Sequence, residues 1–234
     1  MNKKLTILVV EDEQAILAGL IDVLVFHGYE VDSASDGTTG LQKSLTGQYD
    51  LLLLDVMLPG VSGFDICNQV REQDKEQAII MLTAKSSDED IVQGLQYGAD
   101  DYVAKPFSVA QLVLRIQAVL RRTASAMHEA KHIVIANNLS VDVENLTGKR
   151  DDQTMSFTRK EMDMLQYLSS HSERPVSREE LLNKVWGYNK NMEIETRTVD
   201  IHIAKIRRKI ELNHKHPLHL ITVRGAGYRL CIEA

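Results

Sequence analysis

The sequence predicts an α/β fold with a parallel sheet for the first half of the chain, followed by a smaller α+β domain. Short apolar segments alternate five times with helical segments over residues 1–122, which is the order of β-α-β units. Two of these segments, Leu5–Val10 and Leu51–Leu54, are apolar apart from Thr6, as central strands buried on both faces should be. The alternation stops near residue 122, so a second domain is expected beyond it.

The first half contains five predicted strands and five predicted helices. We expect strands at Leu5–Val10, Glu30–Ala34, Leu51–Leu54, Ile79–Leu82 and Tyr102–Ala104. Apolar residues at helical spacing predict helices at Gln14–His27, Gly37–Thr46, Gly63–Gln73, Asp88–Tyr97 and Val109–Arg121.

The second half has a different order of elements. Residues 123–131 show no strong periodicity and are predicted to link domains at 1–122 and 132–234. Ile133–Val143 and the turn after it suggest short antiparallel strands. The remaining elements are predicted helices at Thr158–Ser170, Ser177–Val185 and Thr196–Leu212, then a hairpin at Leu220–Ile232 around Gly225 and Gly227. This order is typical of a winged helix-turn-helix domain.

Composition separates the two halves and limits the compartment. Residues 1–122 carry 10 Lys and Arg against 18 Asp and Glu, a net charge of −8, whereas the remainder of the chain is +2. This asymmetry favours two domains with different partners. Cys67 and Cys231 form no disulfide framework, which fits a reducing cytosol. No secretory signal or membrane-spanning apolar stretch is evident, so we expect a cytoplasmic protein without a membrane partner.

Polar side chains stand where four of the predicted strands end. Glu11 and Asp12 follow the first strand, Asp55 the third, Thr83 the fourth and Lys105 the fifth. Ligands of open parallel sheets bind at the carboxyl ends of the strands, so these side chains should share one pocket. Three neighbouring carboxylates need a cation, and their oxygen atoms favour Mg²⁺. Asp55 is the best candidate nucleophile, because aspartyl phosphate is a known covalent intermediate, and Thr83 and Lys105 would bind phosphoryl oxygens.

Each of these residues alone has a simpler interpretation. Acidic residues after a strand are often loop or N-cap residues, Thr83 would be a cap, and Lys105–Pro106 would be a turn. Their coincidence at successive strand ends favours the shared pocket.

The predicted helix Thr196–Leu212 carries a candidate DNA-binding surface. An apolar stripe formed by Val199, Ile203, Ile206 and Ile210 should face a core. Another face suits phosphate contacts and base reading, and it carries Arg197, Thr198, Ile201, His202, Lys205, Arg208 and Lys209. Taken alone, this helix is equally compatible with an ordinary solvated basic face.

Four segments of the first half closely resemble a response-regulator receiver domain: VVEDE (9–13), LLLLDVMLPGVSGFD (51–65), MLTAK (81–85) and GADDYVAKPF (98–107). The resemblance implies a flavodoxin-like sheet of order 2-1-3-4-5 and Asp55 as the phosphoacceptor. It implies Mg²⁺ bound directly by Asp12 and Asp55, by Glu11 through water, and by the Met57 carbonyl. Lys105 would pair with the phosphoryl group, and the Lys105–Pro106 bond is expected to be cis. Thr83 and Tyr102 match the switch pair of the family, in which phosphorylation draws the hydroxyl inward and lets the ring rotate.

The second half closely resembles the output domain of OmpR/PhoB-type regulators, in FTRKEMDMLQYL (157–168), VSREELLNKVWG (176–187), ETRTVDIHIAKIRRKI (195–210) and ITVRGAGYRL (221–230). This implies that Thr196–Leu212 is the recognition helix. Val223–Leu230 would form a wing, with Thr222 and Arg224 at the DNA. Trp186 and the loop Gly187–Glu195 lie where the family contacts DNA or RNA polymerase, although Trp186 is equally compatible with a core role. His202 is expected to face DNA rather than a metal.

The resemblance also implies partners. A sensor histidine kinase, or a small acyl phosphate, would phosphorylate Asp55. Two receivers would then pair through the fourth helix, fifth strand and fifth helix. Two output domains would then bind adjacent half-sites of promoter DNA. The expected interface consists of Glu89, Ile91, Asp101, Gln111, Arg115 and Arg122, with intersubunit ion pairs Asp101–Arg115 and Glu89–Arg122. Ile91 and Gln111 stand where relatives commonly carry opposite charges, which predicts a weaker, more apolar or differently registered pairing.

Two functions other than a phosphorylation-dependent DNA-binding regulator are compatible with parts of the sequence. A phosphatase could use the same carboxylates, but no segment suggests a substrate-binding site, so the chain is not expected to be an enzyme. A DNA-binding protein that uses the receiver only to dimerise is the remaining alternative, and the complete set Glu11, Asp12, Asp55, Thr83 and Lys105 argues against it.

Overall fold

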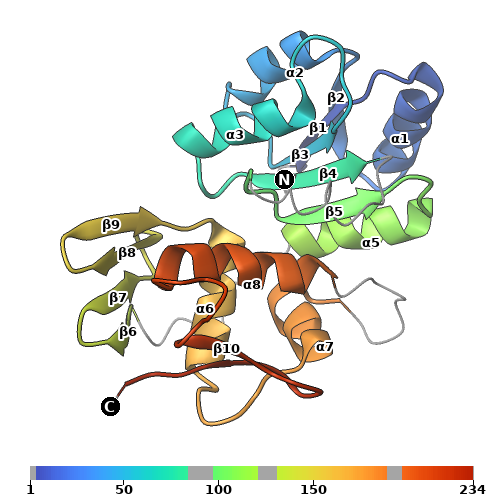
Figure 1. Ribbon diagram of the computed structural model, residues 1–234. Coiled ribbons are helices and arrows are strands. Elements are labelled where there is room, and N and C mark those ends of the chain that lie inside the picture. Colours follow the sequence, from blue (N-terminus) through green and yellow to red (C-terminus); the bar gives the residue numbers. More distant parts are fainter. Residues whose placement is uncertain (1–3, 84–96, 121–130, 189–196, 234) are drawn as a thin grey trace. The chain divides into compact units, whose positions relative to one another are not determined.

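The structure is a computed structural model that describes residues 4–83, 97–120, 131–188 and 197–233. Its contacts divide the chain into two compact units, Met1–Arg121 and Arg122–Ala234. Each unit is described by itself below (Figure 1). The predicted linker, residues 123–131, lies outside the described residues except for Lys131.

The first unit contains a five-stranded sheet in the order β2-β1-β3-β4-β5, and every pairing is parallel. The strands are β1 (Thr6–Val10), β2 (Glu30–Ala34), β3 (Leu51–Asp55), β4 (Ala78–Thr83) and β5 (Asp101–Ala104). The predicted fold class and strand order are therefore confirmed. Asp55 and Thr83 are themselves the last residues of their strands, because the ladder extends one residue further than the apolar pattern.

The helices of the first unit are α1 (Gln14–Phe26), α2 (Gly37–Ser44), α3 (Gly63–Gln73) and α5 (Val109–Leu120). Asp36 and Ser62 accept hydrogen bonds from the backbone N–H groups of Thr39 and Asp65, so the side chains that precede α2 and α3 satisfy their first turns. The predicted fourth helix, Asp88–Tyr97, lies outside the described residues except for Tyr97.

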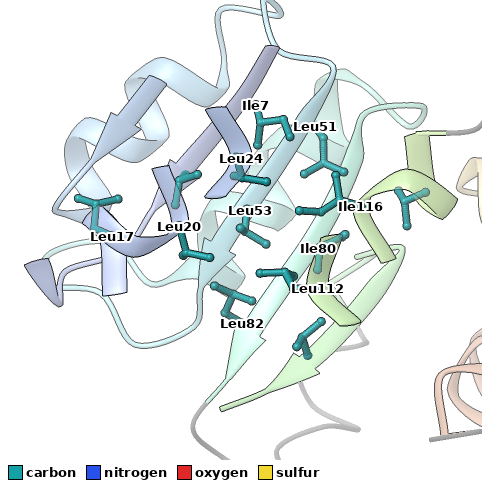
Figure 2. Close-up of a cluster of buried hydrophobic side chains, with 13 residues drawn as sticks. Ile7, Leu17, Leu20, Leu24, Leu51, Leu53, Ile80, Leu82, Leu112 and Ile116 are labelled. Atoms are coloured by element: carbon teal, nitrogen blue, oxygen red, sulfur yellow. The ribbon is translucent and has the colours of Figure 1, made fainter. Parts of the chain in front are cut away.

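The central strands of the sheet are buried on both faces, and alternate residues of β1, β3 and β4 belong to different cores. Ile7 and Val9 pack with Leu51 and Leu53 in a cluster that includes residues of α1 and α5, and Figure 2 shows this cluster. The other core lies on the α2 and α3 side and includes Leu8, Val10, Leu52, Leu54 and Ile66. The continuous apolar character of β1 and β3 follows from this two-sided burial.

The second unit begins with a four-stranded antiparallel sheet in the order β6-β7-β8-β9. Its strands are β6 (His132–Ala136), β7 (Leu139–Asp142), β8 (Thr147–Arg150) and β9 (Gln153–Ser156). The helical part contains α6 (Arg159–Ser169), α7 (Arg178–Leu181), the π-helical turn η1 (Leu182–Trp186) and α8 (Arg197–Ile210). The final hairpin pairs β10 (Leu220–Val223) with β11 (Gly227–Leu230). This arrangement is the predicted winged helix-turn-helix.

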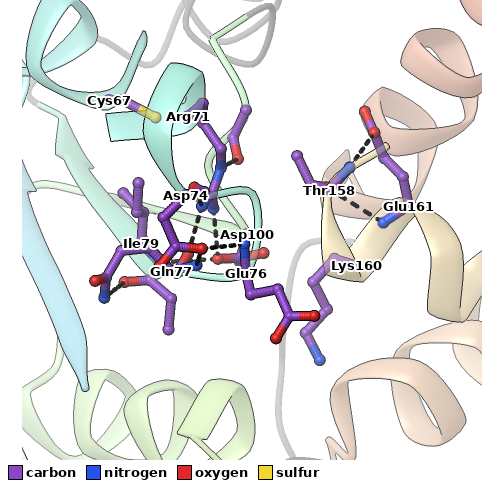
Figure 3. Close-up of polar contacts among 12 residues, drawn as sticks. Cys67, Arg71, Asp74, Glu76, Gln77, Ile79, Asp100, Thr158, Lys160 and Glu161 are labelled. Atoms are coloured by element: carbon purple, nitrogen blue, oxygen red, sulfur yellow. Dashed lines mark hydrogen bonds and ion pairs between the residues drawn. The ribbon is translucent and has the colours of Figure 1, made fainter. Parts of the chain in front are cut away.

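The start of α6 is held by a capping box. The hydroxyl of Thr158 accepts from the Glu161 backbone N–H, and the Glu161 carboxylate accepts from the Thr158 backbone N–H at 2.8 Å (Figure 3). Across the described part of the chain, no helix combines the length and the apolar character that a membrane crossing requires.

A polar cluster on α6 and α7 gives a test of stability against pH. Arg174 donates hydrogen bonds of 2.6 and 3.0 Å to the Glu180 carboxylate, and the Tyr167 hydroxyl donates one of 2.6 Å. The bonds from Arg174 are the main reason that the pKa of Glu180 is lowered to about 2, from an ordinary value of 4.5. Because the folded pKa is depressed, the carboxylate stabilises the fold above pH 4.5, and this contribution is lost as the pH falls toward 2.

We therefore expect Glu180→Gln to lower the free energy of unfolding at neutral pH by up to about 1 kcal/mol, since the pair is partly exposed. The difference from wild type should shrink below pH 4.5. Urea unfolding followed by the emission of Trp186, the only tryptophan, measures the second unit. A difference that stays constant with pH would contradict the assignment.

Candidate functional site

Three carboxylates meet at the carboxyl edge of the parallel sheet. Glu11 follows β1, Asp12 follows Glu11, and Asp55 ends β3, which lies beside β1. Their ligand oxygens all lie within 4.8 Å of one another. Glu11 and Asp55 are buried, whereas Asp12 is exposed. One side of the cluster is therefore open to a ligand.

Lys105 neutralises part of this charge. Its Nζ lies 2.7 Å from Asp55 Oδ2 and 2.8 Å from Glu11 Oε2, and 3.9 Å from the more exposed Glu13 carboxylate. Lys105 follows β5, and its backbone N–H donates to the Thr83 carbonyl at 2.7 Å. The Lys105–Pro106 bond is cis, as expected.

The pKa values in the pocket reflect its burial. Desolvation is the main reason that the pKa of Glu11 is raised, and repulsion from Asp55 adds to it, while Lys105 acts against it. Burial alone would lower the pKa of Lys105, but the hydrogen bonds to Asp55 and Glu11 outweigh this and raise it. The amino group of Lys105 therefore stays positively charged beside the two carboxylates.

The donor set of the pocket fits a hard divalent cation. Three carboxylates lie close together, one of them open to solvent, and Mg²⁺ commonly binds through one or two carboxylates while it keeps several waters. The backbone N–H of Met57 donates to Asp55 Oδ1 at 3.1 Å, which places the Met57 peptide beside the cluster. Coordination by the Met57 carbonyl stays a prediction.

Thr83 and Tyr102 lie on the neighbouring strands β4 and β5. Thr83 is buried at the end of β4, opposite Ala104, and Tyr102 pairs with Met81. The Tyr102 ring is partly buried and packs against the core on the α3 side. Burial is the main reason that the pKa of its hydroxyl is raised well above the ordinary value. The two residues thus lie on the same face of neighbouring strands, two register positions apart, while their role as a switch stays a prediction.

The start of β5 is held by a buried arginine that the sequence did not single out. Arg71 of α3 donates from Nε to the Gly98 carbonyl at 2.8 Å and from Nη1 to the Gln77 carbonyl at 2.5 Å. Its Nη2 pairs with Asp100 at 3.0 Å, and Asp100 also accepts from the Ile79 N–H at 2.8 Å (Figure 3). Arg71 thereby connects α3, β4 and the residues next to Tyr102.

The predicted recognition helix corresponds to α8. Val199, Ile203, Ile206 and Ile210 are buried, as the apolar stripe predicted. Among the residues predicted to contact DNA, Arg208, Thr222 and Arg224 are exposed. Thr198, Ile201, His202 and Lys205 are buried. The backbone of Arg197 begins the helix.

Several of these residues have partners within the second unit. Lys209 Nζ pairs with the buried Glu161 carboxylate at 2.5 Å. Burial would raise the pKa of Glu161, but Lys209 and Lys205 outweigh it and hold this pKa below its ordinary value. His202 Nδ1 lies 2.9 Å from the Thr198 carbonyl. Contacts of these residues with DNA therefore stay predictions.

Trp186 is packed inside the second unit. Its side chain is buried, its ring meets that of His202 edge to face at 5.0 Å, and Lys160 Nζ lies 5.9 Å from the ring centre. These contacts support the core interpretation of Trp186. Of the loop Gly187–Glu195, only Gly187 and Tyr188 are described.

The expected dimer face is described only in part. Glu89, Ile91 and Arg122 lie outside the described residues. Gln111 is exposed on α5. Arg115 Nη1 pairs with Asp101 Oδ2 at 2.8 Å within the same chain. The prediction placed this ion pair between two subunits, whereas the structure forms it within one chain. An ion pair between subunits would have to form in addition to this intrachain pair or take its place.

Comparison with known proteins gives the same two parts. Residues 7–117 match the response regulator receiver domain family, and residues 152–230 match the family described as transcriptional regulatory protein, C terminal. The alkaline phosphatase synthesis transcriptional regulatory protein PhoP of Bacillus subtilis is 40% identical, over 98% of this chain and 97% of its own length. The response regulator ArlR of Staphylococcus haemolyticus is 41% identical, over 95% and 97%.

Solved structures agree over the full length. A structure of a RitR mutant covers 98% of this chain and 100% of its own, with 29% identity and a TM-score of 0.73. The response regulator DrrB of Thermotoga maritima, described as an OmpR/PhoB homologue, covers the same shares with 30% identity and a TM-score of 0.52.

Proposed function

This chain belongs to the OmpR/PhoB family of two-component response regulators, which are transcriptional regulators rather than enzymes, and from that premise we propose that phosphorylation of Asp55 controls its binding to promoter DNA. The observation that carries the proposal is the pocket in which Lys105 Nζ bridges Asp55 and Glu11 beside the exposed Asp12. Residues 1–122 would act as the receiver, 123–131 as the linker and 132–234 as the output domain.

In this proposal a sensor histidine kinase supplies the phosphoryl group. An Asp55 carboxylate oxygen attacks the phosphorus of a phosphohistidine, the P–O bond forms as the P–N bond breaks, and the histidine leaves and takes up a proton. Lys105, 2.7 Å from Asp55, would neutralise the charge that develops on the phosphoryl oxygens. Mg²⁺ held by Glu11, Asp12, Asp55 and the Met57 carbonyl would add charge neutralisation when bound.

The change at Asp55 would reach the rest of the receiver through Thr83 and Tyr102. The Thr83 hydroxyl would bind a phosphoryl oxygen, and the Tyr102 ring would repack beside it. Two receivers would then pair through the face that includes Asp101, Gln111 and Arg115, and two output domains would bind adjacent half-sites. The proposal also implies a cytoplasmic location and a contact with RNA polymerase.

Sedimentation velocity tests the assembly step. Wild type and Asp55→Asn are compared with Mg²⁺ and beryllofluoride, a phosphoryl mimic. A shift from monomer to dimer in the wild type alone supports the proposal, and a shift in neither or in both proteins contradicts it. Gln111→Arg is a better probe of the face than a change at Arg115, because Arg115 also pairs with Asp101 inside the chain.

Arg208 gives a test of the DNA interface. It is exposed on α8, so its guanidinium group is accessible to a DNA phosphate. We expect Arg208→Ala to weaken DNA binding and to reduce the slope of log affinity against log salt by about 1, because one fewer counterion is released. Lys184→Ala is the control, because it removes an exposed side chain of the same charge from η1. An unchanged slope for Arg208→Ala would remove this residue from the interface.

A further inference from the structure

Helix α8 is joined to the hairpin by a polar triangle at its first turn. Asp200 Oδ1 accepts a hydrogen bond from Arg178 Nε at 2.6 Å and another from the Tyr228 hydroxyl at 2.7 Å. Arg178 Nη2 donates to the same hydroxyl at 2.8 Å. The Tyr228 hydroxyl therefore donates its one proton to Asp200 and accepts a hydrogen bond from Arg178. These hydrogen bonds join three elements of the second unit, α7, α8 and β11.

A second contact lies two helical turns further along α8. Arg207 donates from Nε to the Leu220 carbonyl at 2.7 Å and from Nη2 to the Thr222 hydroxyl at 2.8 Å. Asp200 and Arg207 are seven residues apart and therefore share one face of the helix. Thr222 and Tyr228 stand directly opposite each other in the hairpin. The helix is thus attached at two points to a single cross-strand pair.

Backbone hydrogen bonds and contacts of its ring with two arginines also hold Tyr228 in place. Its backbone N–H and carbonyl bond to Val176 at 2.9 and 2.7 Å. Its ring lies 4.8 Å from the Arg178 guanidinium and 5.7 Å from that of Arg207. Burial and the bond to Asp200 raise the pKa of the hydroxyl to about 12, so it stays a neutral donor at physiological pH.

The hairpin approaches Val176 as closely as its backbone permits. Gly227 has a φ of 122°, and a Cβ there would lie 2.0 Å from the Val176 carbonyl oxygen. The exposed Arg224 lies between β10 and Gly225, at the free end of the hairpin. The hairpin is therefore held close to its turn, next to Arg224.

We propose that Arg178, Asp200 and Tyr228 are positioning residues that hold the wing at a set orientation to α8, so that the helix and Arg224 engage one DNA duplex together. The proposal rests on the DNA-binding function proposed above. A wing that is held in place pays less ordering entropy on binding, and its contact acts at a high effective concentration once the helix is bound. A wing released from α8 would lose most of that advantage.

A double-mutant cycle in the full-length chain tests the coupling. The probe is a duplex selected from a random-sequence library by the wild-type protein with beryllofluoride. We expect Arg224→Ala to weaken binding about 10-fold in the wild type. In the Tyr228→Phe background the same change should cost only about 2-fold, because a wing without the hydroxyl contacts to Asp200 and Arg178 is less well oriented relative to α8. Tyr228→Phe alone should weaken binding several-fold.

Tyr167→Phe is the matched control. It also removes a tyrosine hydroxyl that donates to a carboxylate, Glu180 at 2.6 Å, but that pair joins α6 to α7 and does not involve α8 or the hairpin. Arg224→Ala should keep its full effect in this background. Thermal unfolding followed by Trp186 emission compares the stability of the two phenylalanine variants. Asp200→Ala, which removes the oxygen that accepts both bonds, provides a second way to open the triangle.

The outcomes separate the two proposals. Equal effects of Arg224→Ala in wild type, Tyr228→Phe and Asp200→Ala would overturn the positioning role while leaving the DNA-binding function intact. Failure of both Arg224→Ala and Arg208→Ala to change wild-type affinity would overturn the proposed interface itself, and the positioning role with it.

Discussion

Asp55→Asn is expected to abolish phosphorylation of the chain by acetyl phosphate and Mg²⁺. Asp55 is the carboxylate at the end of the central strand β3, and Lys105 lies 2.7 Å from it, ready to neutralise a phosphoryl group. Asparagine keeps the size of the side chain but lacks the nucleophilic oxygen anion. Intact-mass spectrometry should show the addition of one phosphoryl group to the wild type and none to the variant.

Asp50→Asn is the matched control for this change. Asp50 lies just before β3, at the opposite edge of the sheet, and its Oδ2 accepts from the Thr6 N–H at 2.8 Å. We expect this variant to be phosphorylated as the wild type is. Phosphorylation of Asp55→Asn to the same extent as wild type would show that another residue is the acceptor.

Arg71→Met is expected to destabilise the first unit strongly. It would leave the Asp100 carboxylate in a buried position without its cation, and it would remove the bonds that hold the Gly98 and Gln77 carbonyls. Breaking a buried ion pair from one side costs about 3–5 kcal/mol, which corresponds to a fall in Tm on the order of 10 °C. Circular dichroism should show the loss, while Trp186 emission, which reports the second unit, should not.

The comparison variant is Lys43→Met. Lys43 pairs with Asp32 at 2.7 Å, but its side chain is 34% exposed, whereas that of Arg71 is 8% exposed. Exposed pairs contribute less than about 1 kcal/mol, so a small change is expected. Equal losses in the two variants would mean that burial does not govern the effect of Arg71.

The features that the sequence predicted are those with a local or periodic signal. The central strands β1, β3 and β4 were recognisable because two-sided burial leaves apolar runs, and the pocket because Glu11, Asp55, Thr83 and Lys105 stand at the ends of strands. The apolar stripe of α8 was likewise predicted from its spacing, and its burial agrees.

Contacts between distant segments leave no such signal. Arg71 and Asp100 are 29 residues apart, and Arg178 and Tyr228 are 50 apart, so neither pair belongs to one repeating pattern. Asp101 and Arg115 were expected to pair between subunits, but β5 and α5 follow each other closely enough for the bond to form within one chain. Lys209 on the basic face of α8 was predicted to contact DNA, but its amino group pairs with the buried Glu161 carboxylate of the same unit.

The central proposal is that the state of Asp55 sets the affinity of the second unit for DNA. It is tested most directly by the dissociation constant of the full-length chain for its selected duplex, with and without beryllofluoride, in wild type and Asp55→Asn. We predict tighter binding with beryllofluoride in the wild type and no change in the variant. Equal affinities of wild type in the two conditions, on a duplex that it binds specifically, would contradict the proposal and favour a DNA-binding protein that does not depend on phosphorylation.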